Sequence, residues 1–200
     1  MKMKNKIQAI YRKSVFYSST SDKLYIVDFT DRTNGARRVE FHENIPQDPN
    51  GIADMDCLLL ENSSRIPVVC NIFDDNQFKD NEGNDISHCE CMLFPESEHE
   101  NIGVAFVEIK DCKPKNISFY KNIVKTQIVS TVRIFRDNGI IEKQCIYGII
   151  SFPRKNKTAF DQTIFDDVTE YKKLYQKYKV HFFPTNSVYV FDEKKLIANY

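Results

Sequence analysis

The sequence lacks several features that would place it in a common class of protein. It contains no run of about 18 uninterrupted apolar residues, so we expect no membrane-spanning helix and no membrane partner. The first ten residues are basic but include neither the apolar segment nor the small-residue cleavage site of a secretory signal. Its six glycines are not clustered, which excludes a glycine-rich phosphate-binding loop.

The cysteines and histidines also lack the spacing of a known site. Six cysteines occur singly within apolar stretches, and the closest two, Cys89 and Cys91, are too near each other for a zinc knuckle. Four histidines are dispersed, with no metal-binding pair and no arrangement typical of a serine hydrolase. We therefore expect reduced, mostly buried thiols and a cytoplasmic location.

The composition and the predicted elements suit one α/β domain with an appendage. Apolar residues make up 42% of the 200 positions and aromatic residues 12%, which is enough for a sizeable core. Residues 23–30 and 36–41 are separated by the turn sequence Thr33-Asn34-Gly35, which predicts a β-hairpin. We expect residues 1–50 to form this N-terminal hairpin extension and residues 51–200 to form an α/β domain.

The most informative stretch is Val104–Lys110, an apolar run that ends in two charged residues. In a strand, Glu108 and Lys110 point to the same side. Val107 and Ile109 then face the opposite side, where we expect a helix to cover them. Charges on a buried strand need compensation, which either a structural ion pair or a hydrolytic metal site would supply.

Further elements follow from hydrophobic periodicity and turn signals. Strands are predicted at 66–73, 88–94, 143–152, 180–183 and 187–191. A helix is predicted from Asn116 or Ser118 to the Asn138-Gly139 stop, and a second over 165–179. A short helix is predicted over 52–61.

Charge is distributed unevenly along the chain although the total is zero. Residues 40–108 contain sixteen acidic and two basic residues, whereas residues 110–157 contain eleven basic and three acidic ones. This predicts either a basic face beside an acidic pocket or two blocks that intermix as ordinary surface after folding.

The order strand, strand with Glu90, strand with Glu108 and Lys110, helix, strand over residues 66–152 resembles the core of the PD-(D/E)XK nuclease superfamily. The resemblance implies a restriction-endonuclease-like fold, with a central mixed sheet of four to five strands flanked by helices. It also implies that Glu90 and Glu108 bind Mg²⁺ or Mn²⁺, that Lys110 acts on the attacking water, and that Gln127 on the helix assists. The expected activity is metal-dependent hydrolysis of DNA phosphodiester bonds by an endodeoxyribonuclease, in phage defence or DNA repair.

Basic residues beyond the strand are candidates for contacts with the DNA backbone: Lys121, Lys125, Arg154, Lys155 and Lys157. Phe119 and Tyr120 are able to stack on bases, but their helical spacing favours a place in the core. A homodimer and a larger defence or repair complex both remain open.

Two alternatives belong to different functional classes. The same fold without catalysis would serve as a binding or assembly module, insensitive to removal of metal. An unrelated α/β protein would use the acidic 40–108 segment to hold a basic protein partner or mimic nucleic acid.

Overall fold

The computed structural model describes residues 2–30, 39–112, 114–154 and 164–198, apart from 48–56, and within these parts it contains two β-sheets and three α-helices. The strands are β1 (Val15–Ser19), β2 (Lys23–Asp28), β3 (Val39–His42), β4 (Leu58–Glu61), β5 (Val68–Ile72), β6 (Cys91–Pro95), β7 (Gly103–Ile109), β8 (Cys145–Ser151), β9 (Val180–Pro184), β10 (Ser187–Val190) and β11 (Leu196–Ala198). The helices are α1 (Met3–Ile10), α2 (Ile117–Asp137) and α4 (Val168–Tyr178), and no helix in the described residues is both long and apolar enough to cross a membrane. The predicted mixed α/β class is confirmed.

The larger sheet has six strands in the order β1-β5-β6-β7-β8-β9. The first four pair antiparallel, and β7, β8 and β9 pair parallel. All seven residues of β7 are buried, because other layers cover both of its faces. The predicted run of strand, strand, strand, helix, strand is present as β5, β6, β7, α2 and β8, but Glu90 lies directly before β6 and not within it, so its predicted place on the strand is wrong.

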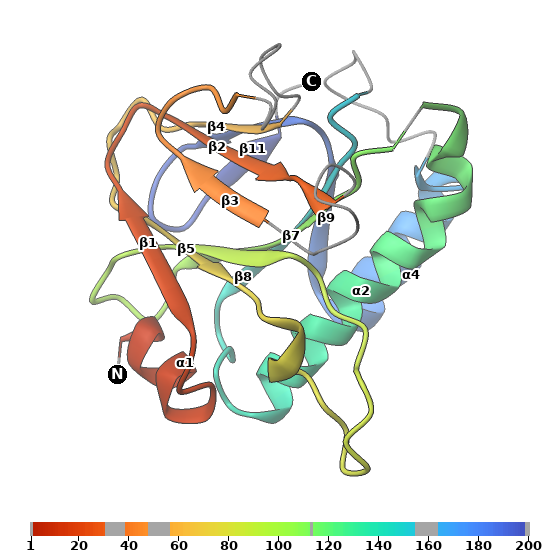
Figure 1. Ribbon diagram of the computed structural model, residues 1–200, viewed down its shortest axis with the longest axis horizontal. Coiled ribbons are helices and arrows are strands. Elements are labelled where there is room, and N and C mark those ends of the chain that lie inside the picture. Colours follow the sequence, from red (N-terminus) through yellow and green to blue (C-terminus); the bar gives the residue numbers. More distant parts are fainter. Residues whose placement is uncertain (1, 31–38, 48–56, 113, 155–163, 199–200) are drawn as a thin grey trace.

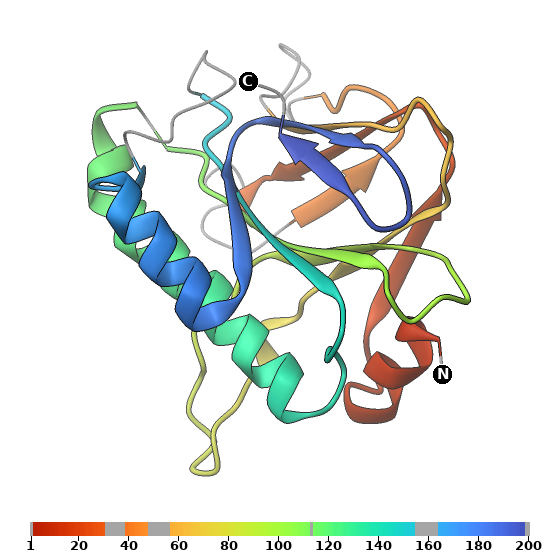
Figure 2. The same ribbon diagram turned by 180° about the vertical axis from the view of Figure 1, so that it is seen from behind.

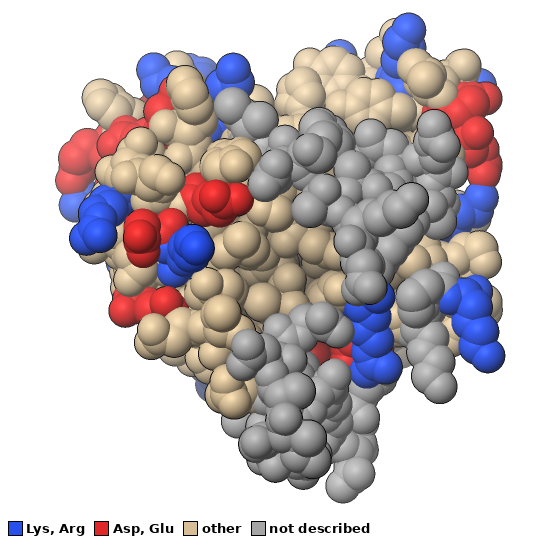
Figure 3. Space-filling view, turned by 90° about the horizontal axis from the view of Figure 1, so that it is seen from above, with Lys and Arg blue, Asp and Glu red and all other residues tan. Residues whose placement is uncertain are grey.

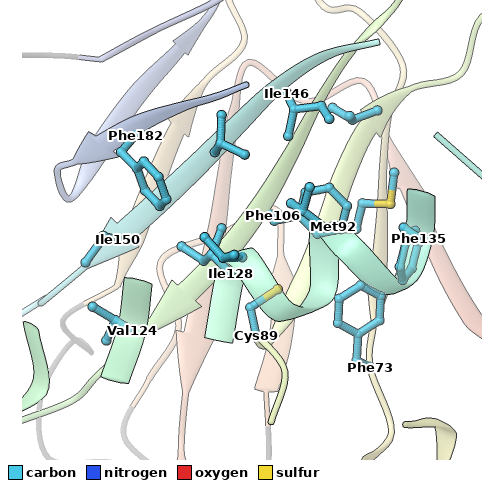
Figure 4. Close-up of a cluster of buried hydrophobic side chains, with 14 of the residues drawn as sticks. Phe73, Cys89, Met92, Phe106, Val124, Ile128, Phe135, Ile146, Ile150 and Phe182 are labelled. Atoms are coloured by element: carbon cyan, nitrogen blue, oxygen red, sulfur yellow. The ribbon is translucent and has the colours of Figure 1, made fainter. Parts of the chain in front are cut away.

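Helix α2 connects the parallel strands β7 and β8 and covers one face of this sheet (Figures 1 and 2). Its apolar stripe packs on residues that include Phe106 and Ile150, and Figure 4 shows Val124, Ile128 and Phe135 of the helix in this cluster. The helix ends as predicted, because Gly139 adopts a φ of 65° that other residues rarely accept. Helix α4 lies alongside α2 in both views.

The second sheet has five strands in the order β11-β10-β4-β2-β3 and covers the opposite face of the larger sheet. Val107 and Ile109 are fully buried in the core between the two sheets, with Leu24, Ile26 and Val188 among their neighbours. The expectation that a helix covers Val107 and Ile109 is therefore wrong. Helix α2 instead packs on the face of β7 that carries Val104 and Phe106, which is also the face of Glu108.

The prediction of one sheet with four to five strands is also wrong, since the described residues form sheets of six and five strands. The hairpin of β2 and β3 is present, with Ile26 opposite Phe41, whereas its turn at Thr33-Asn34-Gly35 lies outside the described residues. It is built into the second sheet through β4, and β1 joins the larger sheet beside β5. The sheets thus combine strands from both sides of residue 50.

Candidate active site

The candidate site begins at the carboxyl end of β7. Glu108 is the penultimate residue of the strand and is completely buried, and Lys110 follows its last residue. The backbone N–H of Lys110 donates to the carbonyl of Ser151 at 2.9 Å, which extends the ladder with β8 and fixes the position of the lysine. The amine Nζ lies 2.6 Å from Oε1 of Glu108, so the two side chains share one side of the strand as predicted.

Glu90 lies directly before β6 and is held from both sides by its backbone. Its N–H donates to the carbonyl of Val107 at 2.9 Å, and its carbonyl accepts from the N–H of Phe73 at 3.0 Å. The ladder between β6 and β7 ends at the pair of Cys91 and Val107, so Glu90 lies just beyond it, beside the carboxyl end of β7. The carboxylates of Glu90 and Glu108 would repel each other, and the amine of Lys110, 3.8 Å from Oε1 of Glu90 and 2.6 Å from Oε1 of Glu108, lies close enough to both to offset this.

A cavity of about 310 Å³ adjoins these residues. Its lining comes from the end of β2 and the residues after it, from the residue before β6, from the segment after β7 and from α2, and consists of Asp28, Thr30, Glu90, Lys110, Asp111, Cys112, Tyr120 and Gln127. This volume lies at the lower end of the range typical of small-ligand pockets. Glu90, Lys110 and Gln127 therefore face one cavity, and Glu108 contacts Lys110 from the protein interior.

Gln127 projects from α2 into this region. Its Nε2 donates to the carbonyl of His88 at 3.1 Å, which fixes the orientation of the amide. Its Oε1 is buried and has no hydrogen-bond partner among the described residues. A buried acceptor is costly to leave unsatisfied, and this oxygen is an unsatisfied polar atom of the interior behind the cavity wall.

Asp28, the last residue of β2, is an acidic residue of the site that the sequence analysis did not single out. It is buried, lines the cavity, and its Oδ1 accepts from the N–H of Thr30 at 2.9 Å. The sequence did contain a signal, because Leu24-Tyr25-Ile26-Val27 is an apolar strand that ends in a carboxylate, as Val104–Lys110 does. Its proximity to Lys110 depends on the packing of one sheet on the other.

The electrostatics of the site keep Lys110 protonated. Burial acts to lower the pKa of the amine, but the charges of Glu108, Glu90 and Asp28 outweigh it, and the pKa of Lys110 is raised above its usual value. Three carboxylates around one ammonium leave a formal excess of two negative charges. This excess is the charge that a divalent cation would balance.

The donor set fits a hard cation such as Mg²⁺, because it consists of carboxylate and amide oxygens. Among the described residues, no group of three or more histidine, cysteine, aspartate or glutamate side chains is arranged to hold a metal by itself. Mg²⁺ is commonly bound by one or two carboxylates and takes its other ligands from water and substrate phosphate. The described residues thus do not form a closed metal-binding cage.

The basic residues predicted to contact DNA have partners within the protein where they are described. Lys121 pairs with Asp166, and Arg154 binds both carboxylate oxygens of Asp111. Lys125 is buried, pairs with Glu170 and donates to the carbonyl of Ile164 at 3.1 Å. Lys155 and Lys157 lie outside the described residues.

Acidic and basic side chains lie next to each other around the margin of the face in Figure 3, with uncharged residues between them. Residues outside the two charge blocks also pair with them: Lys4 of the N-terminal helix contacts Glu96 of the acidic block at 2.9 Å, and Asp166 pairs with Lys121 of the basic block. On this face, acidic and basic side chains are therefore interspersed.

The comparisons with known proteins identify no relative. No protein family matches the chain, and no curated protein or solved structure is significantly similar to it. Inference about function therefore depends on the geometry of the site.

Proposed function

We propose that this protein is a Mg²⁺- or Mn²⁺-dependent endodeoxyribonuclease of the PD-(D/E)XK type that hydrolyses DNA phosphodiester bonds. One observation carries the proposal: Lys110 lies within 3.8 Å of Glu90 and 2.6 Å of Glu108 beside a cavity of about 310 Å³. The order β5-β6-β7-α2-β8, with β7 and β8 parallel, is the element order on which the resemblance to this superfamily rests. The finer assignment to a restriction-endonuclease-like fold is part of the proposal.

We assign each residue of the site a role in the proposed reaction. Glu90 and Glu108 would hold the metal, with Asp28 adding negative charge at the cavity wall and the carbonyl of Ile109 available as a further oxygen donor. The bound metal would neutralise charge on the phosphate and lower the pKa of a water molecule. Because the carboxylates keep Lys110 protonated, its amine offsets the charge that develops on the phosphate and orients the water by hydrogen bonding. Gln127, whose Nε2 is fixed by the carbonyl of His88, would assist from α2 at the cavity wall.

We extend the proposal to the partners and the setting that the sequence analysis named: DNA as the substrate, a cytoplasmic role in defence or repair, and a homodimer or a larger complex as alternatives. Of the predicted backbone contacts, we retain Lys121, Arg154, Lys155 and Lys157. Lys125 is assigned instead to the packing of α2 against the segment before α4, because it is buried there and paired with Glu170.

The decisive experiment is cleavage of supercoiled plasmid by the purified chain with Mg²⁺ or Mn²⁺. We expect nicking or linearisation, and a loss on the order of 10³-fold in the separate variants Glu108→Gln and Lys110→Ala. Lys79→Ala is the matched control, since Lys79 also pairs with an acidic residue, Asp85, but lies in an exposed loop. Circular dichroism must show that all variants remain folded. Cleavage that persists in both site variants would refute the assignment.

The second candidate is a catalytically inactive nuclease-like domain that binds a protein or nucleic acid partner. It is favoured by the direct contact between Lys110 and Glu108, which is also the geometry of a structural ion pair. This candidate predicts no cleavage with either metal, together with partner binding that EDTA does not change.

A further inference from the structure

Two aromatic residues at the start of α2 differ in their environment although they are adjacent in sequence. Tyr120 is partly buried, packs against the helix-side core and lines the cavity, which agrees with the predicted core position. Phe119 is 71% exposed, so its predicted place in the core is wrong. The two rings meet edge to face, with centroids 5.1 Å apart and an interplanar angle of 88°.

The geometry of α2 places these two aromatic residues next to the candidate site. Tyr120 and Gln127 are seven residues apart, which places them on one side of α2, and both line the cavity. Phe119 and Ile123 are four residues apart and form the neighbouring stripe, and Ile123 is 40% exposed. An exposed apolar strip therefore begins at the rim of the cavity that contains Lys110.

We propose that Phe119, supported edge to face by Tyr120, forms a stacking platform for an unpaired base, and that the substrate class is single-stranded DNA or a single-stranded segment of it. This inference rests on the proposed function and deepens it. Aromatic side chains bind single strands by stacking on successive bases, a contact unavailable to bases already stacked within a duplex. A strand whose base lies on Phe119 continues through its sugar and phosphate toward the cavity.

Charge favours this occupant over an apolar protein segment. The cavity beside the strip holds the ammonium of Lys110 among the carboxylates of Asp28, Glu90 and Glu108. Such a site, once loaded with a divalent cation, attracts a phosphodiester, whereas an apolar protein segment leaves its charges uncompensated. The combination of an exposed aromatic ring and an adjacent cation site thus matches a nucleotide chain.

The test measures binding by fluorescence anisotropy in the Glu108→Gln variant with Ca²⁺. The probes are a labelled 12-nucleotide oligothymidylate, an abasic oligomer of equal length, and a 12-base-pair duplex. Adding Phe119→Ala should weaken oligothymidylate binding about 5- to 150-fold and leave binding of the abasic oligomer unchanged.

Phe191→Ala is the matched control. Phe191 is 58% exposed and lies far from the candidate site. The carbonyl of nearby Glu193 accepts from the N–H of Gly103, the first residue of β7. At about 3.3 Å per residue along the strand, Gly103 is about 20 Å from Lys110. This variant should bind all three probes as the parent does.

Three results would overturn the inference: equal affinity for oligothymidylate and the abasic oligomer, no effect of Phe119→Ala, or no binding to any probe. If Phe119 instead binds a protein partner, Phe119→Ala should not change oligothymidylate binding. Plasmid cleavage by the unaltered protein is measured separately, so failure of the proposed function and failure of the stacking platform are distinguishable.

Discussion

Two lysines of this protein, Lys110 and Lys125, both contact a carboxylate from a mostly buried position, yet their surroundings differ. Lys125 joins α2 to the segment around α4 through Glu170 and the carbonyl of Ile164. Lys110 faces the charges of Glu108, Glu90 and Asp28 and borders a cavity of about 310 Å³.

The difference lies in the balance of charge. One carboxylate and one carbonyl satisfy Lys125, and its contact is complete within the fold. Three carboxylates exceed the single charge of Lys110, so the site near β7 retains negative charge beside open space. A buried lysine with an acidic neighbour therefore indicates a functional site only where charge or space is left over.

The largest expected effect is a difference in stability between variants of these two lysines. Lys110→Met leaves the fully buried Glu108 without its nearest cation, and we expect it to lower the free energy of unfolding by about 3–5 kcal/mol. Lys125→Met leaves Glu170, whose side chain is 28% exposed and able to regain water, and should cost about 1 kcal/mol. Urea unfolding of both variants without divalent metal, at pH 7, measures the two losses.

A double variant makes this comparison robust if Lys110→Met unfolds the protein. Lys110→Met combined with Glu108→Gln removes both charges, and should recover most of the lost free energy because no ion remains unpaired at that position. Equal losses for the two lysine variants, or no recovery in the double variant, would contradict the contrast between the sites.

An intermediate effect is expected for Asp28→Asn. Asparagine keeps the oxygen that accepts from the N–H of Thr30 but removes the charge beside Lys110. If Asp28 helps hold the metal at the proposed site, plasmid cleavage should fall about 10- to 100-fold and the Mg²⁺ concentration for half-maximal rate should rise.

The matched control is Asp85→Asn, since Asp85 lies in an exposed loop and pairs with Lys79. It should leave both the rate and the metal dependence unchanged. A reduced rate in Asp28→Asn with an unaltered Mg²⁺ dependence would instead indicate a purely structural role for Asp28.

Local patterns were sufficient to predict the elements around the proposed site. The periodicity of α2, its Gly139 stop and the apolar run of β8 all depend on residues close in sequence. The meeting of Glu90 and Glu108 follows from one antiparallel pair, β6 and β7, whose connection is short. These local relations explain why Glu90, Glu108 and Lys110 were found together.

The second sheet was not predicted, because its pairings connect distant segments. Residues 58–61, predicted as part of a short helix, form β4, in which Leu58 and Leu60 are buried and Leu59 and Glu61 are partly exposed. Three consecutive leucines conceal this alternation in the sequence, and residues 52–56 of that prediction lie outside the described residues. Pairing of β4 with β10 spans more than 120 residues and has no local signal. Asp28 was missed for the same reason, since only that sheet brings it to Lys110.

The smallest effect is a pH dependence that belongs to Lys110 alone. Its pKa is raised by Glu108, Glu90 and Asp28, which together outweigh the opposing effect of burial. A raised pKa in the folded state stabilises the protein fully below the unfolded value of 10.5, and this contribution is lost as pH rises through the folded value. The difference in unfolding free energy between the unaltered protein and Lys110→Met should thus be constant from pH 8 to 10 and shrink above pH 10.5. Tyr11, which is partly buried, and Tyr147, which is buried, also have pKa values raised by burial, but they titrate in both proteins and cancel in this difference. A difference that stays constant to pH 11.5 would mean that the three carboxylates do not hold the proton on Lys110, and the contrast with Lys125 would lose its electrostatic basis.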